Sequence, residues 1–231
     1  MKKLFVVLFS SLVLAVNASA STNISDDFRD HYDPTSLSAY NKDISALIGL
    51  SDFHTGKATT FPGFDIGGSF SAVKVGKNNH NSGEDYLMTG FLRAETYIPV
   101  VGVTVAVRGT DFNGFESIGG GLKYSYDFLE IAHLSVSGFY DRAKTDYYTL
   151  DHYSASAVVS ASLPVVTPYV GVGYDYGDLA VRRIDTRSTS DGSMRYTAGA
   201  NFHPFPFIYV FGAYTKTSGS EGFNAGLGLN F

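Results

Sequence analysis

The feature that most constrains the fold of this chain is an alternation of apolar with small or polar residues that begins at Phe64. The last stretch, Glu221 to Phe231, shows it most clearly, because glycine and asparagine fill every position between its apolar residues. Those apolar residues are Phe223, Ala225, Leu227, Leu229 and Phe231. A period of two is that of a β-strand with one apolar and one polar face, so we predict an all-β fold from Phe64 onward.

The alternation recurs in ten segments that short and long connections separate in turn. Ten strands of about 10 residues each use about 100 positions, and residues 64–231 leave room besides for nine connections. We therefore predict ten strands, with eight as the alternative number. Such a chain predicts a closed antiparallel up-and-down transmembrane β-barrel, and closure removes exposed strand edges. Tight turns are predicted at 99–102, 127–130, 164–168 and 204–206, and the longest loop at Arg182 to Gly192.

The distribution of charge favours a membrane barrel over a soluble β-sandwich or a lipocalin-like barrel. In those soluble folds the exposed face carries many charges, whereas here the charged residues cluster in the connections and at a few positions opposite the apolar face. The chain has 16 Tyr, 18 Phe, no Trp and 25 Gly, and its mean hydropathy is +0.01. Strands that face lipid on one side and a polar lumen on the other average to such a value.

The first residues have the pattern of a secretory signal peptide. Lys2 and Lys3 precede an apolar run from Leu4 to Val16, and Ala18-Ser19-Ala20 gives a small-residue cleavage site. A membrane-spanning helix needs about 20 apolar residues, so the run is too short to be an anchor. We expect cleavage after Ala20 and export of the mature chain. The absence of cysteine excludes disulfides, a lipoprotein anchor, thiolate metal sites and thiol catalysis.

Residues 21–63 are expected to form an N-terminal periplasmic segment ahead of the barrel. Its first part is polar, acidic and expected to be flexible. Asp33 followed by Pro34 has the pattern of an N-cap and a first helical position. We therefore predict a helix over about 34–49 that ends at Gly49. Its apolar residues at helical spacing are Leu37, Tyr40, Ile44, Leu47 and Ile48.

This amphipathic helix has two predicted positions. It plugs the lumen or caps the periplasmic mouth of the barrel, or it lies on the membrane surface. A surface helix usually has a polar face rich in lysine and arginine, and this helix carries only Lys42. We therefore expect a plug or a cap.

The signal peptide, the alternating strands and the final Phe231 together resemble the bacterial outer-membrane β-barrel proteins. The resemblance implies the cell outer membrane of a Gram-negative bacterium, with outer-membrane lipid and lipopolysaccharide as partners. It also implies that the outer-membrane assembly machinery recognises the chain through Phe231, since a terminal aromatic residue is the signal in this class.

The face opposite the apolar one collects charged residues of both signs, which we expect in the lumen. Paired charges are the simplest interpretation, because a barrel of this size has little open interior and an inserted helix would fill more of it. The sequence thus predicts a non-enzymatic barrel, either structural or a narrow, gated, porin-like solute channel. The predicted lumen charges are Arg93, Glu95, Arg108, Lys123, Asp175 and Arg195.

The charge balance also limits the partners. Without Lys2 and Lys3 the mature chain has 17 − 2 = 15 basic residues against 22 acidic ones. Binding to nucleic acid needs a basic patch, so we expect no nucleic-acid partner. The sequence predicts no cofactor and no metal site.

A surface enzyme is one alternative function. The omptins, outer-membrane proteases that also have ten strands, use acidic residues and a histidine at the extracellular rim. Glu84, Asp85, Asp151 and His152 stand where predicted strands two and six begin, and a histidine beside a carboxylate can act as a general base. Neighbours on a strand point to opposite faces, however, so these are rim candidates and no catalytic residue is assigned.

Two further alternatives rest on less. A lipid-A-modifying barrel resembles this chain in having a helix ahead of the barrel, which is a likeness of architecture alone. A barrel that binds lipopolysaccharide or another ligand would use the predicted long loop, where Arg182, Arg183 and Arg187 suit anionic groups.

Overall fold

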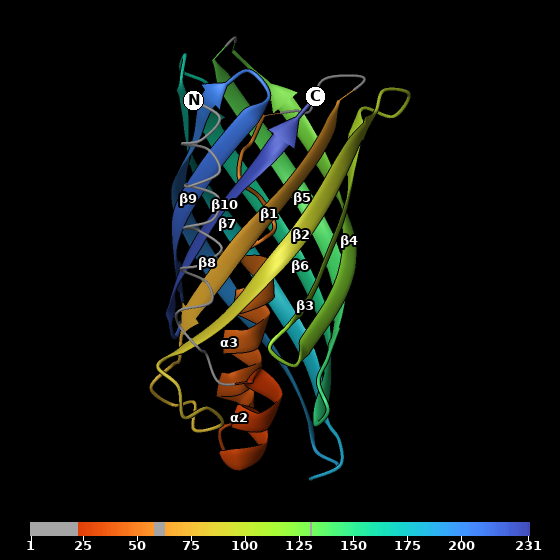
Figure 1. Ribbon diagram of the computed structural model, residues 1–231, viewed down its shortest axis with the longest axis vertical. Helices are drawn as coiled ribbons and strands as arrows, with labels where there is room; N and C mark the ends of the chain where they lie inside the picture. Colours follow the sequence, from red (N-terminus) through yellow and green to blue (C-terminus); the bar gives the residue numbers. More distant parts are fainter. Residues whose placement is uncertain (1–22, 58–62, 130) are drawn as a thin grey trace, which may run out of the picture.

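The computed structural model describes residues 23–57, 63–129 and 131–231 and shows a closed barrel of ten antiparallel strands (Figure 1). The strands follow one another around the ring in sequence order, so the predicted fold class is confirmed with ten strands as the number. The helices are α2 (Ile24–Asp30) and α3 (Leu37–Gly49), and the strands are β1 (Phe64–Lys74), β2 (Tyr86–Ile98), β3 (Val103–Phe112), β4 (Phe115–Asp127), β5 (Ala132–Lys144), β6 (Tyr148–Ala161), β7 (Val166–Val181), β8 (Ser188–Phe205), β9 (Ile208–Thr217) and β10 (Glu221–Asn230).

Pairing of β1 with β10 closes the ring. The two strands are antiparallel, with Phe70 opposite Ala225 near the middle of the ladder. Beyond it, the Phe231 N–H donates to the Phe64 carbonyl at 2.9 Å, and the Phe64 N–H donates to the Phe231 carbonyl at 3.0 Å. Closure satisfies the backbone groups that a lipid environment could not.

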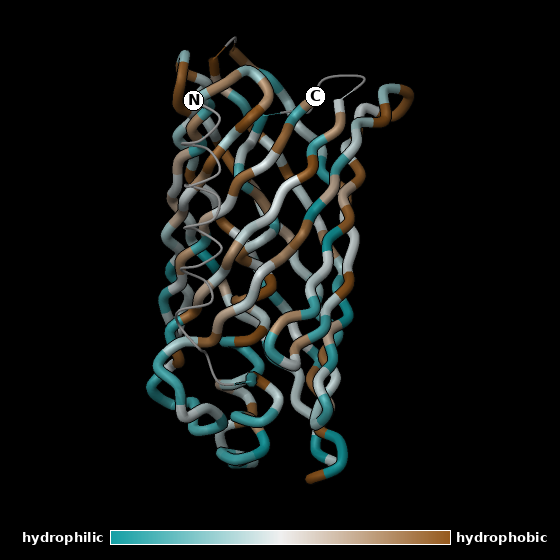
Figure 2. Tube along the Cα trace, in the orientation of Figure 1, coloured by the Kyte–Doolittle hydropathy of each residue, from teal (hydrophilic) through white to brown (hydrophobic). Residues whose placement is uncertain are grey.

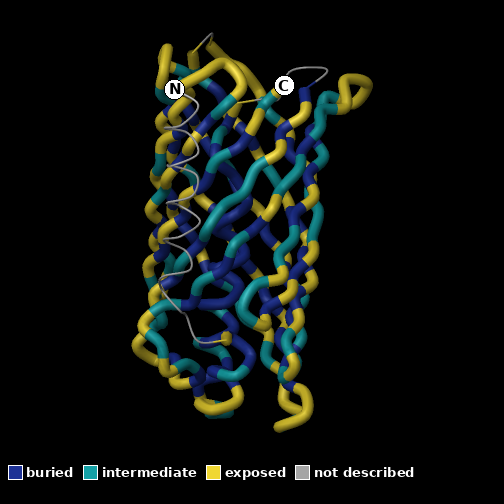
Figure 3. The backbone as a smooth tube through the Cα atoms, viewed as in Figure 1, coloured by how far each residue is buried: buried dark blue, intermediate teal, exposed yellow. Residues whose placement is uncertain are grey.

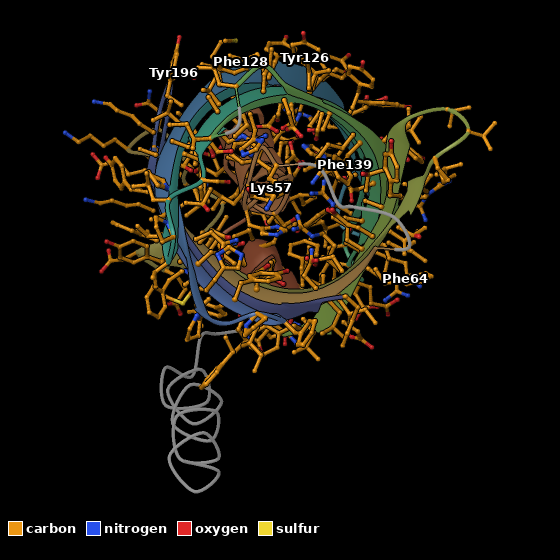
Figure 4. All side chains as sticks on the ribbon, turned by 90° about the horizontal axis from the view of Figure 1, so that it is seen from above. Lys57, Phe64, Tyr126, Phe128, Phe139 and Tyr196 are labelled. Atoms are coloured by element: carbon orange, nitrogen blue, oxygen red, sulfur yellow. The ribbon has the colours of Figure 1, made fainter. Side chains whose placement is uncertain are left out.

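Hydropathy and burial alternate along the strands (Figures 2 and 3), and the two faces of the sheet are inverted relative to a soluble protein. Leu92 on the outer face is 75 % exposed, whereas Arg195 on the inner face is 1 % exposed. Viewed along the barrel, Tyr126 and Tyr196 point away from the ring and Phe139 points into it (Figure 4). So large an exposed apolar surface indicates contact with lipid, and the facing predicted from the alternation is confirmed.

β9 is the strand that the sequence leaves without an orientation, because both of its faces are apolar. Tyr209 and Phe211 are buried and point inward, while Val210 is exposed. The ring of His54 stacks on Tyr209 at 4.6 Å between centroids and lies 5.4 Å from that of Phe211. The N-terminal segment thus packs against the inner face of β9, and this packing explains why that face is apolar.

The predicted long loop from Arg182 to Gly192 is wrong. β8 already begins at Ser188, and residues 188–192 pair with β7, for example Ser190 with Asp178. Backbone pairing does not require an apolar face, so the ladder continues through polar residues. The longest connection between described strands is instead 75–85, between β1 and β2.

The predicted start of the main helix is also wrong. α3 begins at Leu37 with Ser36 as its N-cap. The Asp33 side chain instead accepts hydrogen bonds from the Thr35 N–H and hydroxyl at 2.8 and 2.7 Å, which lower its pKa. This local turn competes with the helix start, as short polar side chains often do.

A second helix, α2, forms in the polar segment that the sequence predicts to be flexible. Asn23 caps it by accepting from the Ser25 and Asp26 N–H groups. Ile24 and Phe28 lie one helical turn apart and are both buried. Two apolar residues are too few to mark a helix by periodicity, so tertiary burial stabilises it. Among the described residues, the longest helices fall short of the length and apolarity needed to cross a bilayer.

The N-terminal segment runs through the barrel. α2 and α3 lie at the end of the barrel that carries connections 75–85 and 182–187, which we call the loop end (Figure 1). The opposite end, where β1 begins and β10 ends, we call the terminal end. Lys57 lies inside the ring near this terminal end (Figures 1 and 4). Tyr40 and Ile44 of α3 are fully buried, which excludes a helix on the membrane surface. Of the predicted positions the helix has that of a plug. The predicted cap at the terminal mouth is wrong, since the chain crosses the lumen before β1.

The glycines of β4 give a test of this inner packing. A Cβ on Gly121, which faces the lumen, would lie 2.5 Å from the Gly138 carbonyl and overlap the Phe139 ring, whereas one on the outward-facing Gly120 would be 3.4 Å from the nearest atom, the Ala106 carbonyl. We expect Gly121→Ala to destabilise the folded barrel by about 1–3 kcal/mol, as overpacking does. Gly120→Ala is the matched control. The urea midpoint of the refolded barrel measures both, and equal midpoints would contradict the packing.

Candidate functional site in the barrel lumen

The helices fill the loop end of the lumen with apolar side chains. Phe28 of α2 packs against Tyr40 and Tyr148 with ring centroids 4.8 and 4.9 Å apart. The Tyr40 hydroxyl lies 3.1 Å from that of Tyr148. Burial of a large apolar side chain stabilises by about 1.5–3 kcal/mol. The loop end is thus closed by the kind of contact that forms a protein core, with Ile44, Leu47, Ile48, Leu150 and Leu179 also buried in this cluster.

On its polar side, α3 lies directly against the barrel wall. The Asn41 side-chain amide donates to the Gly177 carbonyl at 2.8 Å. A Cβ on Gly177 would overlap Asn41 and Ser45, so glycine is needed here for the close approach. Ser38 donates to Asp191 at 2.8 Å, and the helix is therefore bonded to β7 and β8.

Asp52, in the segment after α3, lies between two arginines of the wall. Its Oδ1 is 2.8 Å from Arg108 Nη1 and its Oδ2 is 2.5 Å from Arg195 Nη2. The Ser156 hydroxyl also donates to Oδ2 at 2.9 Å. All three charged side chains are buried. Pairing on both carboxylate oxygens compensates for the removal of the charges from water.

The wall arginines each have a second partner on the wall. Arg108 forms two bonds to Asp141, at 2.7 and 2.5 Å, and Arg195 Nε lies 3.0 Å from Asp175. His152 bridges the two aspartates, with its Nδ1 3.1 Å from Asp141 and its Nε2 3.4 Å from Asp175. We call Asp52, Arg108, Asp141, His152, Asp175 and Arg195 the central cluster.

The central cluster holds three carboxylates and two guanidinium groups, so a proton on His152 makes it neutral. Arg195 Nη1 also donates to the Gly49 carbonyl at the end of α3, where a positive charge is favourable because of the helix dipole. A Cβ on Gly49 would overlap the Asp175 carboxylate. The end of the helix and the cluster are therefore in direct contact.

A second group of charges lies toward the terminal end. Glu95 pairs with both Arg93 and Lys123, at 3.2 Å in each case, and Asp65 accepts from the Tyr209 hydroxyl at 2.7 Å. These residues adjoin or line a cavity of about 140 Å³ that the N-terminal segment and the wall enclose. All six predicted lumen charges lie inside the barrel, divided between this group (Arg93, Glu95, Lys123) and the central cluster (Arg108, Asp175, Arg195).

Two members of the central cluster are not among the site residues predicted from the sequence. Asp141 lies on the inward face of β5, where the alternation places it, but nothing local marks its partners. Asp52 follows a helix in a stretch without periodicity, so its position depends on the path of the segment. A carboxylate next to an expected plug is the signal that could have pointed to it.

The four rim candidates do not form a shared site. Asp151 faces outward and accepts from the Tyr140 hydroxyl at 2.7 Å, whereas His152 next to it is buried in the central cluster. Glu84 and Asp85 lie in the connection between β1 and β2. The described residues also contain no group of three or more side chains that could hold a metal ion.

At the loop end, α2 and the residue Tyr32 after it are bonded to the connections between strands. Asp27 accepts from the Ser82 hydroxyl at 2.5 Å. Burial and a bond from its hydroxyl to Asp185 raise the pKa of Tyr32 to about 12. Each of four connections contributes a bond: Asn113 O to Ile24 N at 2.9 Å, Ser25 Oγ to Asp146 N at 3.2 Å, Asp27 Oδ1 to Gly83 N at 3.0 Å, and Tyr32 Oη to Asp185 Oδ2 at 2.6 Å.

Asp43 connects α3 to the β1–β2 connection. Its carboxylate accepts from the Gly76 N–H at 2.9 Å and from the Asn79 side-chain amide at 2.7 Å. The longest connection is thereby bonded to the helix that fills the lumen.

Comparison with known proteins bears on the whole barrel. The family described as outer membrane protein beta-barrel domain matches residues 44–231, and no curated protein matches the chain. The structure of the COG4313 outer membrane channel from Pseudomonas putida F1 is 10% identical, covers 78% of this chain and 100% of its own, and has a TM-score of 0.53.

Two further solved structures are more distant in shape. The N-terminal β-barrel domain of Pseudomonas aeruginosa OprF is 12% identical, covers 73% of this chain and 97% of its own, and has a TM-score of 0.41. The KdgM porin is 9% identical, covers 72% and 99%, and has a TM-score of 0.42. At such identities the likeness concerns the fold alone.

The charge balance of the central cluster can be tested by substituting His152 and Asp151, which are adjacent in β6 but lie on its inner and outer faces. His152→Ala leaves Asp141 and Asp175 without the group between them, and we expect a loss of about 3–5 kcal/mol in the free energy of unfolding, as for other broken buried pairs. Asp151→Asn, on the outer face, should change it by less than about 0.5 kcal/mol. Urea unfolding of the refolded barrel measures both free energies. A free energy of unfolding that His152→Ala leaves unchanged would show that the cluster needs no positive charge at this position.

Proposed function

The chain belongs to the outer membrane protein beta-barrel domain family, and we propose that it is a narrow outer-membrane channel held closed by its own residues 23–57. The observation that carries this proposal is the position of Asp52 between Arg108 and Arg195. A buried contact of this kind fixes the position of the segment against the wall, because Asp52 loses both of its guanidinium partners when the segment withdraws, and breaking a buried pair is costly.

The wall is suited to lose the segment without being left unpaired. Arg108 keeps Asp141 and Arg195 keeps Asp175 when Asp52 withdraws. The wall at this level also carries hydroxyl groups, such as that of Ser156. Water can fill a lumen with such a wall once the segment has withdrawn.

The apolar contacts at the loop end keep the closed state dominant. Tyr40, Ile44 and Leu47 of α3 are all fully buried, and each would lose about 1.5–3 kcal/mol of burial energy on exposure. Opening thus requires a solute or partner that binds the open state better than the closed one. The cavity of about 140 Å³ at the terminal end gives a small polar solute a first place to bind.

A purely structural barrel is the second candidate, and the same apolar contacts favour it. In that case the N-terminal segment is a permanent part of the core. The Pseudomonas putida structure is described as an outer membrane channel. It supports the channel over the structural barrel because the same fold forms a channel in that protein. We propose no catalytic role, since Asp151 and His152 face opposite sides of the wall.

The partners that we propose follow from the two ends of the barrel. Arg142 and Lys144 face outward near the loop end with more than half of each side chain exposed, at 60% and 62%, which suits contact with lipopolysaccharide phosphates. Arg183 and Arg187 of the β7–β8 connection are equally exposed, at 67% and 60%. Each of these four basic side chains also pairs with an acidic residue, so all four support such contact to a similar degree. At the terminal end Phe231 is exposed and stacks on Phe207, where the assembly machinery could recognise it.

Conductance across a planar bilayer tests the channel. Asp52→Asn removes one ionic partner and leaves the wall pairs in place. A loss of about 3 kcal/mol for a broken buried pair corresponds to an increase of about 100-fold in the open fraction. Wild-type barrels should be closed almost all the time, and deletion of residues 21–57 should give steady conductance.

Asp26→Asn, an exposed change on α2, is the control and should leave the conductance at the wild-type level. Each variant is first shown to be folded by its altered gel mobility without heating. A folded deletion variant that conducts no better than the wild type would contradict the channel and support the structural barrel.

A further inference from the structure

The direction of the N-terminal segment through the barrel has a consequence for the cell surface. The described chain begins at Asn23 beside the β3–β4 connection at the loop end, passes through the lumen as α3 and residues 50–57, and reaches the terminal end before β1 (Figure 1). The first described residue of the segment and the first residue of β1 therefore lie at opposite ends of the barrel.

The length of the segment agrees with this path. α3 has 13 residues, which rise about 20 Å at 1.5 Å each. Residues 50–52 continue it in turns, and residues 53–57 can add up to about 18 Å. The apolar band of a membrane barrel is about 25 Å tall. The segment is thus long enough to cross the membrane inside the barrel and to place α2 beyond it.

The orientation of the barrel decides which side α2 is on. In outer-membrane barrels the short turns are periplasmic and the longer loops extracellular. The terminal end has only short connections among those described in full, 99–102, 162–165 and 206–207. The loop end has three that are equally short, 113–114, 145–147 and 218–220, but it also has the two longest, 75–85 and 182–187. The terminal end therefore faces the periplasm, and the loop end faces the outside.

From these observations we infer that the N-terminal segment enters its own barrel from the cell exterior. α2 lies at the cell surface, while Lys57 faces the periplasm. The barrel thus displays α2 to the outside. Of the N-terminal segment that the sequence predicts to be periplasmic, only the part near Lys57 faces the periplasm.

The bonds of α2 explain why it would stay there. Its backbone and side chains are bonded to the β1–β2, β3–β4 and β5–β6 connections, through Gly83, Asn113 and Asp146. All of these connections are at the loop end. Phe28 is buried beneath them against Tyr148. At the periplasmic mouth none of these partners would be within reach.

Surface labelling of single-cysteine variants tests the inference, because the chain has no cysteine of its own. Asp26→Cys reports on α2, Thr186→Cys on the β7–β8 connection and Val100→Cys on the β2–β3 turn. Thr186 and Val100 are exposed, and 48% of the Asp26 side chain is exposed. Intact cells are treated with a maleimide attached to a polyethylene glycol too large to cross the outer membrane. We expect Asp26→Cys and Thr186→Cys to label fully and Val100→Cys to label only after the outer membrane is permeabilised.

Two outcomes would overturn the inference. In the first, Thr186→Cys labels on intact cells but Asp26→Cys labels only after permeabilisation, so the segment does not reach the outside. In the second, Val100→Cys alone labels on intact cells, so the barrel has the opposite orientation. Labelling of the unfolded proteins confirms that each cysteine is reactive. The result is independent of conductance, since a permanently closed barrel would display α2 in the same way.

Discussion

Closure of the sheet is the constraint on which the rest of this structure depends. Backbone groups within lipid must be satisfied by the protein itself, and a closed ring of strands is one of two ways to do so. Here the ring closes through β1 and β10, with Phe64 and Phe231 bonded to each other by their backbones. Once the ring is closed, alternate side chains must face either lipid or lumen, and the inverted arrangement of apolar and polar residues follows.

The closed ring creates a second requirement, because the N-terminal segment fills its interior and the charges there are buried from water. The central cluster meets it by pairing: each wall arginine has a wall aspartate, and His152 lies between the two aspartates. Asp52 is then added from the N-terminal segment, on the inner side of the same arginines. The wall and the segment are therefore coupled by electrostatics at mid-barrel and by apolar packing at the loop end.

These two kinds of contact have different consequences for function. Apolar packing of α2 and α3 stabilises the closed barrel but carries no information about what would open it. The ionic contact is specific, since it depends on one carboxylate between two guanidinium groups, and a change of charge in the lumen can weaken it. Glycines at Gly49 and Gly177 allow the helix to lie against the wall at both places, so the plug is accommodated by the shape of the wall as well as by its charge.

The sequence by itself determined the strands, their facing and the residues that line the lumen. A period of two is a local property, and it holds wherever one face meets lipid and the other does not. It therefore predicted the inward positions of Arg93, Glu95, Arg108, Lys123, Asp175 and Arg195. The stretch from Asp33 to Gly49 likewise predicted a helix, although a local turn at Asp33 moved its start to Leu37.

Only the tertiary structure decided which of these residues meet, and from which end the segment enters. Asp52 and Arg195 are separated by most of the barrel in sequence, and their contact depends on closure of the whole ring. The helix α2 forms because Phe28 is buried under connections that come together only in the barrel. The continuation of β8 to Ser188 depends on a partner strand rather than on its own polar residues. Such features arise from contacts between distant parts of the chain, which no local pattern records.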